Sequence, residues 1–180
     1  STEQILAYTI DGKEYPFLAK DELERALPVL KKAYLKYSDV AGKTVQYMFY
    51  DLFKDYKELQ AEVLASSCFI NDGKGNFTRT DLPQELQVAP IFAFAPYASG
   101  YLAAGNFYGV IPYEGRYDAL QPGFFSYNKQ PSAFQYQSSL AGIAGEARDT
   151  KWINYAGGEK VLIIARNNQP LIFLKPTTNK

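Results

Sequence analysis

The segment that best predicts the architecture of this chain reads Ala104-Gly-Asn-Phe-Tyr-Gly-Val-Ile-Pro-Tyr-Glu-Gly-Arg-Tyr-Asp118. It opens as an apolar strand and continues as a loop in which aromatic residues alternate with glycine and proline. A second segment, Asn71-Asp-Gly-Lys-Gly-Asn-Phe77, has glycine and asparagine where a hairpin turn needs positive φ angles. Together they predict strands joined by tight turns, the pattern of an antiparallel β-protein.

Short strand-like runs fill the chain after residue 60, and their connections are rich in Gly, Asn, Pro and Ser. Since no helical pattern separates them, they predict antiparallel meanders of the kind that form propeller blades. Val161-Leu-Ile-Ile-Ala165 is uniformly apolar, so we expect an inner strand covered on both faces. The expected strands are Val63–Ile70, Asn76–Thr80, Pro90–Ala95, Tyr101–Phe107, Gly123–Tyr127, Ala133–Gln137, Lys151–Tyr155, Val161–Ala165 and Pro170–Leu174.

The first 60 residues carry a different pattern. Ile5–Ile10 and Lys13–Phe17 flank the two-residue turn Asp11-Gly12, which predicts a hairpin within residues 1–19. Apolar residues at helical spacing then predict a pair of helices within residues 20–60, with Pro28 interrupting the first. The spaced residues are Leu23, Leu27, Leu30 and Tyr34 in one helix and Val45, Met48, Phe49, Leu52 and Phe53 in the other.

The two helices carry recognisable start signals. Asp21 is the expected N-cap of the first helix, and Glu24 completes a capping-box pattern with it. Thr44 is the expected N-cap of the second. We therefore expect residues 1–180 to form a single domain or propeller fragment, mainly β and propeller-like, with about two blades in residues 61–176 and a helical insertion over residues 20–60.

The ordered set of motifs resembles the C-terminal region of secreted bacterial FG-GAP/VCBS-repeat β-propeller proteins, which are related to the cartilage-acidic-protein group. The resemblance implies a protein that binds rather than catalyses and that is extracellular, on the cell surface or in the periplasm. It also implies a fragment, one piece of a complex, or a reduced relative. The motifs are Asp11-Gly-Lys-Glu-Tyr-Pro-Phe17, Asn71-Asp-Gly-Lys-Gly-Asn-Phe77, Ala104-Gly-Asn-Phe-Tyr-Gly109, Glu114-Gly-Arg-Tyr-Asp118, Gly145-Glu-Ala-Arg-Asp149 and Ala165-Arg-Asn-Asn-Gln-Pro-Leu171.

One departure from the family concerns calcium. The family's blades carry an Asp-rich loop whose carboxylates bind Ca²⁺. Ala95-Pro-Tyr-Ala-Ser-Gly-Tyr101 stands in the corresponding place and has no carboxylate. We therefore expect no metal site, and we expect no cofactor.

Composition limits the classes of partner. Lysine and arginine number 19, as do aspartate and glutamate, so no net charge favours nucleic acid or an anionic membrane. No apolar run approaches the roughly 20 residues of a membrane helix, so we expect no membrane-spanning segment. The chain begins at Ser1, which we interpret as the start of a processed or excised product whose export signal lies outside it.

The segment Ala104–Asp118 presents aromatic rings on a loop that glycine and proline shape. Such rings are suited to stacking on a sugar or on a partner's side chains. The alternative is that these rings fill the space between blades. In the binding interpretation, hydrogen bonds from Asn106 and Glu114 set the orientation of the ligand. The expected ligand-binding residues are Asn106, Tyr108, Tyr113, Glu114, Arg116, Tyr117 and Asp118.

Two clusters of charge accompany this loop, namely Glu114, Arg116 and Asp118, and then Glu146, Arg148 and Asp149. Since an arginine lies beside each carboxylate pair, we expect salt bridges that tie loops to the sheet rather than a general acid. The chain also lacks histidine, the usual general base. We therefore predict no catalytic residue; the competing hypothesis is a carbohydrate-active hydrolase that uses Glu114 and Glu146.

The sequence thus predicts a non-catalytic, exported binding or assembly module that engages a protein partner or the remaining blades of a propeller. A glycan-binding module is the alternative. Two blades do not close a ring, so the exposed edge strands need a cover, either the helices or a partner chain.

Overall fold

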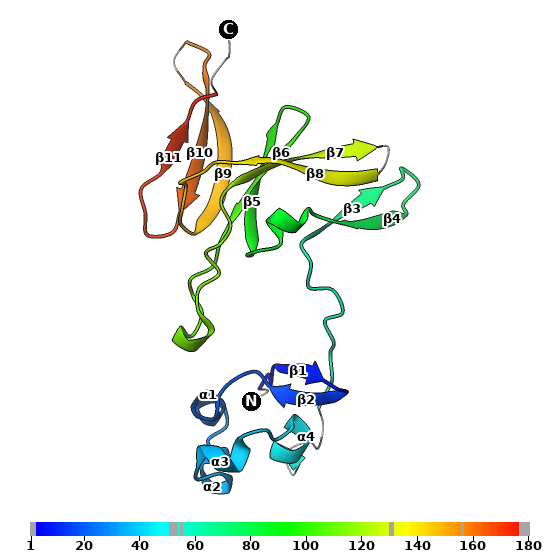
Figure 1. The fold of residues 1–180 in the computed structure, drawn as a ribbon, viewed down its shortest axis with the longest axis vertical. Coiled ribbons are helices and arrows are strands. Elements are labelled where there is room, and N and C mark those ends of the chain that lie inside the picture. Colours follow the sequence, from blue (N-terminus) through cyan, green and yellow to red (C-terminus); the bar gives the residue numbers. More distant parts are fainter. Residues whose placement is uncertain (1–2, 51–53, 55, 130–131, 156, 177–180) are drawn as a thin grey trace. The chain divides into compact units, whose positions relative to one another are not determined.

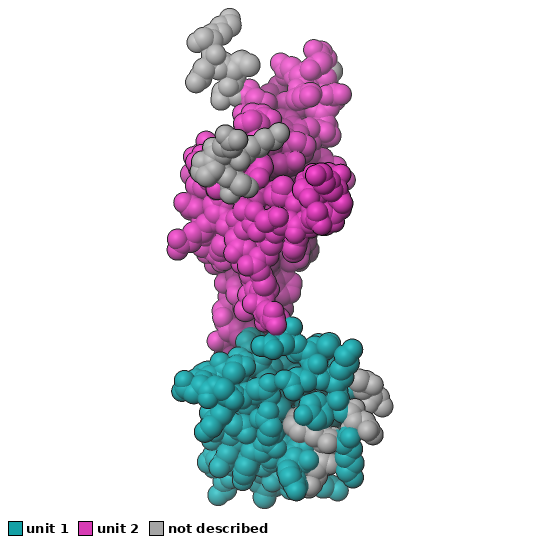
Figure 2. Space-filling view, turned by 90° about the vertical axis from the view of Figure 1, so that its right-hand side faces the viewer, with its two compact units in different colours: residues 1–60 teal, residues 61–180 magenta. Residues whose placement is uncertain are grey.

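The computed structural model describes residues 3–50, 54, 56–129, 132–155 and 157–176. The chain divides into two compact units, residues 1–60 and 61–180, which Figure 2 colours teal and magenta. The predicted mainly β class is confirmed, with antiparallel sheets of two to four strands in the described residues, none of which closes on itself (Figure 1). No described helix is long and apolar enough to cross a membrane.

The first unit begins with the predicted hairpin, β1 (Ala7–Ile10) and β2 (Lys13–Pro16). Its two turn residues, Asp11 and Gly12, both have positive φ angles, as a two-residue hairpin turn of the mirror-image type requires. Four short helices follow instead of the expected pair: α1 (Lys20–Ala26), α2 (Leu30–Ala33), α3 (Tyr37–Val40) and α4 (Val45–Met48). Pro28 lies between α1 and α2, where its missing N–H ends the first helix.

The apolar stripes predicted for the helices meet in one core, which contains Leu23, Leu30, Val45, Met48 and Phe49. The predicted Thr44 cap is confirmed, because its hydroxyl accepts the Tyr47 N–H at 3.2 Å. Leu52 and Phe53 lie outside the described residues.

The predicted Asp21 cap and capping box are wrong. Ala19 is the N-cap of α1 and makes no side-chain capping bond, whereas Asp21 lies inside the first turn. Its carboxylate accepts a 2.6 Å hydrogen bond from the Tyr37 hydroxyl, and this bond raises the pKa of Tyr37 to about 12. Glu24 forms an ion pair with Lys20 instead of returning to the cap.

Each strand-like run after residue 60 contains a strand. The strands are β3 (Ser67–Asn71), β4 (Phe77–Asp81), β5 (Ile91–Tyr97), β6 (Gly100–Gly105), β7 (Gly123–Lys129), β8 (Ser132–Ser139), β9 (Ala147–Asn154), β10 (Lys160–Arg166) and β11 (Ile172–Leu174). Strands β5 to β8 form one consecutive meander, β9 to β11 a second, and β3–β4 a separate hairpin (Figure 1). In the β3–β4 turn, the Asp72 carboxylate accepts the N–H groups of Lys74 and Asn76.

Alternation along β6 gives the four-stranded sheet two apolar faces. Leu102 and Ala104 belong to the core that contains Leu162 and Ile164 of β10, so this face packs on the three-stranded sheet. Ala103 belongs to the opposite core, with Leu86 of the 3-10 turn η2 (Gln84–Leu86). The central strand of the meander is therefore covered on both sides.

Strand β10 is the middle strand of its sheet, as predicted. Leu162 and Ile164 are buried, while Ile163 on the other face is only half-buried, so the prediction of complete cover on both faces is wrong for that residue. Strand β9 lies along the edge strand β5, and the Trp152 indole N–H donates to the Pro96 carbonyl at 2.6 Å. Pro96 lies on an edge strand, where the lack of a backbone donor is tolerated.

Candidate functional site

The candidate site is the connection between β6 and β7, which we term the aromatic loop (residues 106–120). Its two arms are joined by a pair of backbone hydrogen bonds between Phe107 and Tyr117, of 2.8 and 3.0 Å. A 3-10 turn, η3 (Pro112–Glu114), forms its tip. Figure 1 shows the loop extending away from the four-stranded sheet.

Asn106 closes the base of the aromatic loop. Its side-chain amide donates to the Leu120 carbonyl at 2.9 Å and accepts the Leu120 N–H at 3.0 Å, so it pairs with that backbone as a neighbouring strand would. The second amide hydrogen is donated to the Gly145 carbonyl at 3.0 Å. Asn106 has a φ of 84°, a conformation that asparagine adopts more readily than most residues.

The expected role of Asn106 in ligand binding is therefore not supported by its position. The residue is only 1% exposed, and both hydrogens of its amide are used within the protein. A buried amide with this geometry fixes the base of the loop, since leaving any of these partners unpaired would be costly.

Glu146 and Arg148 attach the aromatic loop to β9. The Glu146 carboxylate accepts the Tyr108 backbone N–H at 2.7 Å, the Arg148 guanidinium at 2.6 Å and the Asn167 side-chain amide at 2.9 Å. The guanidinium also donates to the Asn106 carbonyl at 2.9 Å and stacks on the Phe92 ring. This network therefore holds the start of the loop, at Asn106 and Tyr108.

The hydrogen bonds to Glu146 favour its charged form. Donation from the Tyr108 N–H, then from Asn167, lowers its pKa below the usual range, while burial opposes this and the Arg148 charge adds to it. The predicted salt bridge between a loop and the sheet is confirmed for Glu146 and Arg148. Asp149 is paired differently, with Lys151 at 2.9 Å.

The predicted salt bridges are wrong for the charged cluster in the loop itself, which consists of Glu114, Arg116 and Asp118. No ion pair joins Arg116 to Glu114 or Asp118 among the described residues, although the three alternate along the chain. The Arg116 guanidinium instead lies over the Tyr108 ring, with its central carbon 5.2 Å from the ring centroid. Cation–π stacking therefore replaces the expected salt bridge.

The expected ligand-binding residues occupy two faces of the aromatic loop. Phe107 and Tyr117 are directly paired, so their side chains share one face, and their neighbours Tyr108 and Arg116 share the other. The second face, which we term the pocket face, carries an open pocket of about 300 Å³. Its lining residues are Tyr108, Val110, Pro112, Gly115 and Arg116.

Exposure differs among the polar and aromatic residues at and beside the tip. Tyr113 is 58% exposed, and Asp118 is also exposed. Glu114 is half-buried, and its Oε1 atom has no hydrogen-bond partner in the described residues. The structure thus brings Tyr108 and Arg116 together at the pocket, whereas Asn106 is buried at the base of the loop.

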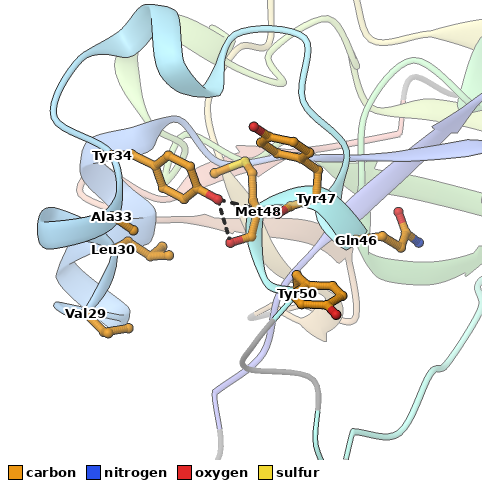
Figure 3. A pocket seen from close by; sticks show the side chains of 8 residues that line it. All are labelled: Val29, Leu30, Ala33, Tyr34, Gln46, Tyr47, Met48 and Tyr50. Carbon is orange, nitrogen blue, oxygen red and sulfur yellow. Dashed lines mark hydrogen bonds between the residues drawn. The ribbon is translucent and has the colours of Figure 1, made fainter.

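Sequence reasoning missed a second pocket, of about 440 Å³, in the first unit (Figure 3). The Tyr34 hydroxyl points across it and donates to the Met48 carbonyl at 3.1 Å. Helical spacing predicted Leu30, Tyr34 and Met48 as core, but the hollow arises where two very short helices meet. It is lined by Val29, Leu30, Ala33, Tyr34, Gln46, Tyr47, Met48 and Tyr50.

No protein-family model, curated protein or solved structure matches this chain. The resemblance to FG-GAP/VCBS propellers stays a prediction. Within the described part of the chain, no group of Cys, Asp and Glu side chains is placed to hold a metal ion.

Gly115 is required by the backbone at the tip. Its φ of 76° and ψ of −178° lie in a region that is essentially restricted to glycine. We expect Gly115→Ala to lower the free energy of unfolding by about 1 to 3 kcal/mol and to shift the amide resonances of Tyr108 and Arg116. Urea unfolding and ¹H–¹⁵N spectra measure this. Asp118→Ala, at an exposed position of the same loop, is the control, and equal stability of the two variants would contradict the assignment.

Proposed function

We propose that this chain is a non-catalytic binding or assembly module of an exported bacterial surface protein, propeller-like in the FG-GAP/VCBS sense, that engages a protein partner. The observation that carries the proposal is the exposed apolar surface at the ends of its sheets. Strand β11 pairs only with β10 among the described residues, and Phe173 on it is 60% exposed. Phe69 and Phe77 of the β3–β4 hairpin are exposed to a similar degree. An edge strand with apolar side chains is a template for pairing with another chain.

The state of Glu146 supports a non-catalytic role. A hydrolase would need one carboxylic acid that gives up a proton beside a second carboxylate. Glu146 is held by three donors, and its pKa is lowered, which keeps it charged rather than protonated. The competing hydrolase hypothesis predicts turnover on a glycan panel that is lost in Glu114→Gln and Glu146→Gln.

The protein-partner proposal predicts that the isolated chain associates through its uncovered edge. We expect size-exclusion chromatography with light scattering to give a mass above that of the 20.2 kDa monomer, rising with concentration. Phe173→Lys should return the mass toward the monomer, because a charged side chain on an edge strand opposes pairing.

Gln121→Lys is the matched control for that experiment. It adds the same charge at an exposed position that lies outside the strands, without removing an apolar side chain. Equal masses for Phe173→Lys and Gln121→Lys, or a monodisperse monomer at every concentration for the parent chain, would contradict the proposed partner surface.

Glycan binding is the second candidate, and the pocket face of the aromatic loop favours it. The pocket combines a phenol ring, a guanidinium and aliphatic side chains within one small concave surface. Saccharides bind to such surfaces through the apolar face of a ring and through hydrogen bonds from its hydroxyls.

A further inference from the structure

Strand β8 is a free edge of the four-stranded sheet. The strand order β5–β6–β7–β8 leaves β8 paired on one side, and among the described residues its backbone hydrogen-bonds only with β7. The β3–β4 hairpin reaches the same core as Phe134 and Tyr136 through Cys68, but it forms a sheet of its own. Alternate N–H and C=O groups of β8 therefore point away from the sheet and meet no partner strand in the described part of the chain.

The sequence of β8 does not protect this edge. Edge strands usually avoid pairing with another chain because they are short or carry lysine, proline or another charge. β8 has eight residues, Ser-Ala-Phe-Gln-Tyr-Gln-Ser-Ser, with no charge and no proline. By contrast, β11 has only three residues, and β9 is as long as β8 but carries Arg148, Asp149 and Lys151. β8 thus offers a long row of backbone groups with nothing to oppose pairing.

The side chains of β8 suit a second copy of the same strand. Its pairing with β7 is regular over residues 132–136. Phe134 and Tyr136 share the face that packs on the core, and the exposed Gln135 lies on the other face. Antiparallel pairing of two copies about a twofold axis at Gln135 puts each Phe134 opposite a Tyr136, so aromatic residues meet on one face. A shift of one residue would set these rings against glutamine instead.

In this register Gln135 faces its own copy. A side-chain amide has both donors and an acceptor, so two glutamines related by a twofold axis can hydrogen-bond to each other. A charged residue at this position would face the same charge in the second copy, which destabilises a strand pair. The neutral pattern of β8 therefore favours a second copy of this chain over a charged partner strand.

We propose that β8 pairs antiparallel with β8 of a second copy, which joins the two four-stranded sheets into one continuous sheet. The interface uses the same residues on both copies, so it closes at a dimer. This edge lies on a different sheet from Phe173. The inference therefore goes beyond the proposed partner surface at β11 and does not depend on it.

The test is sedimentation velocity of the full chain carrying Phe173→Lys, which removes association through β11. We expect this chain to form a concentration-dependent dimer with twice the 20.2 kDa mass of the monomer. Adding Gln135→Lys, or Gln135→Glu in a separate chain, should weaken the dimer at least about tenfold, because like charges then meet across the twofold axis. An equimolar mixture of these two chains should recover the dimer, because opposite charges then face one another.

Gln121→Lys and Gln121→Glu are the matched controls, since they place the same charges at an exposed position outside the strands. Each should dimerise as the Phe173→Lys chain does, alone and when mixed. A Phe173→Lys chain that stays monomeric at every concentration, a dimer that tolerates Gln135→Lys, or a mixture that stays monomeric would each overturn the inference. Association that is lost in Gln135→Lys but kept in Phe173→Lys would support the β8 dimer and contradict only the β11 surface.

Discussion

Asn106→Asp is expected to destabilise the second unit more than any other single substitution in the aromatic loop. The aspartate has no N–H donor, so the buried carbonyls of Leu120 and Gly145 both lose their partner and face a carboxylate. Each unpaired buried group costs about 1 to 3 kcal/mol, which gives a fall of about 2 to 6 kcal/mol in the free energy of unfolding. Trp152, the only tryptophan, lies on β9 and stacks on Tyr97, so its fluorescence reports unfolding of this unit during a urea titration.

Asn154→Asp is the control for that measurement. It makes the same chemical change at the exposed end of β9, where water solvates the new charge. Unfolding midpoints that agree between the two variants would show that the Asn106 amide does not fix the loop base.

The second large effect is expected at Glu146, and it depends on pH. Its pKa is lowered in the folded state, so its charged form contributes stability above the usual glutamate pKa of about 4.3. This contribution is lost as the pH falls from there toward the lowered value. Glu146→Gln removes the charge, and we expect the variant to be less stable at pH 7 by about 3 kcal/mol, near the lower end for a broken buried pair because Arg148 is 33% exposed.

The measurement is the free energy of unfolding of parent and Glu146→Gln between pH 3 and 7. The difference in the free energy of unfolding should shrink as the solution becomes acidic, because the parent then loses the negative charge of Glu146, which the variant lacks at every pH. Exposed carboxylates such as Asp149 and Glu159 also have lowered pKa values, but they titrate in both proteins and cancel in the difference. Glu159→Gln, which breaks only the exposed pair with Lys175, is the control. A constant difference across this range would show that the charge of Glu146 is not the stabilising element.

Sequence patterns predicted the elements that depend on neighbouring residues. The β1–β2 hairpin follows from its Asp11-Gly12 turn. The Thr44 cap follows from a hydroxyl three residues before Tyr47, whose backbone N–H donates to it. The predicted Glu146–Arg148 pair also forms, but the equally spaced Glu114 and Arg116 do not pair, so proximity in the chain is not sufficient.

Contacts between distant residues explain what the sequence did not predict. Asn106 looked like a polar residue of an exposed loop, but its amide partners are 14 and 39 positions away. Asp21 has a residue type that commonly caps helices, but its carboxylate accepts a hydrogen bond from the Tyr37 hydroxyl, 16 positions away. In the same way, the Arg116 guanidinium lies over the Tyr108 ring instead of forming ion pairs with Glu114 and Asp118, the acids on either side of it in the sequence.

The division of the aromatic loop into a fixed base and an open tip has a consequence for protein engineering. Asn106, Glu146 and Arg148 carry the hydrogen bonds that hold the base, and none of these residues belongs to the tip. Residues 110–114 are therefore a graft site, in which a combinatorial library can vary the recognition chemistry while the scaffold beneath stays constant.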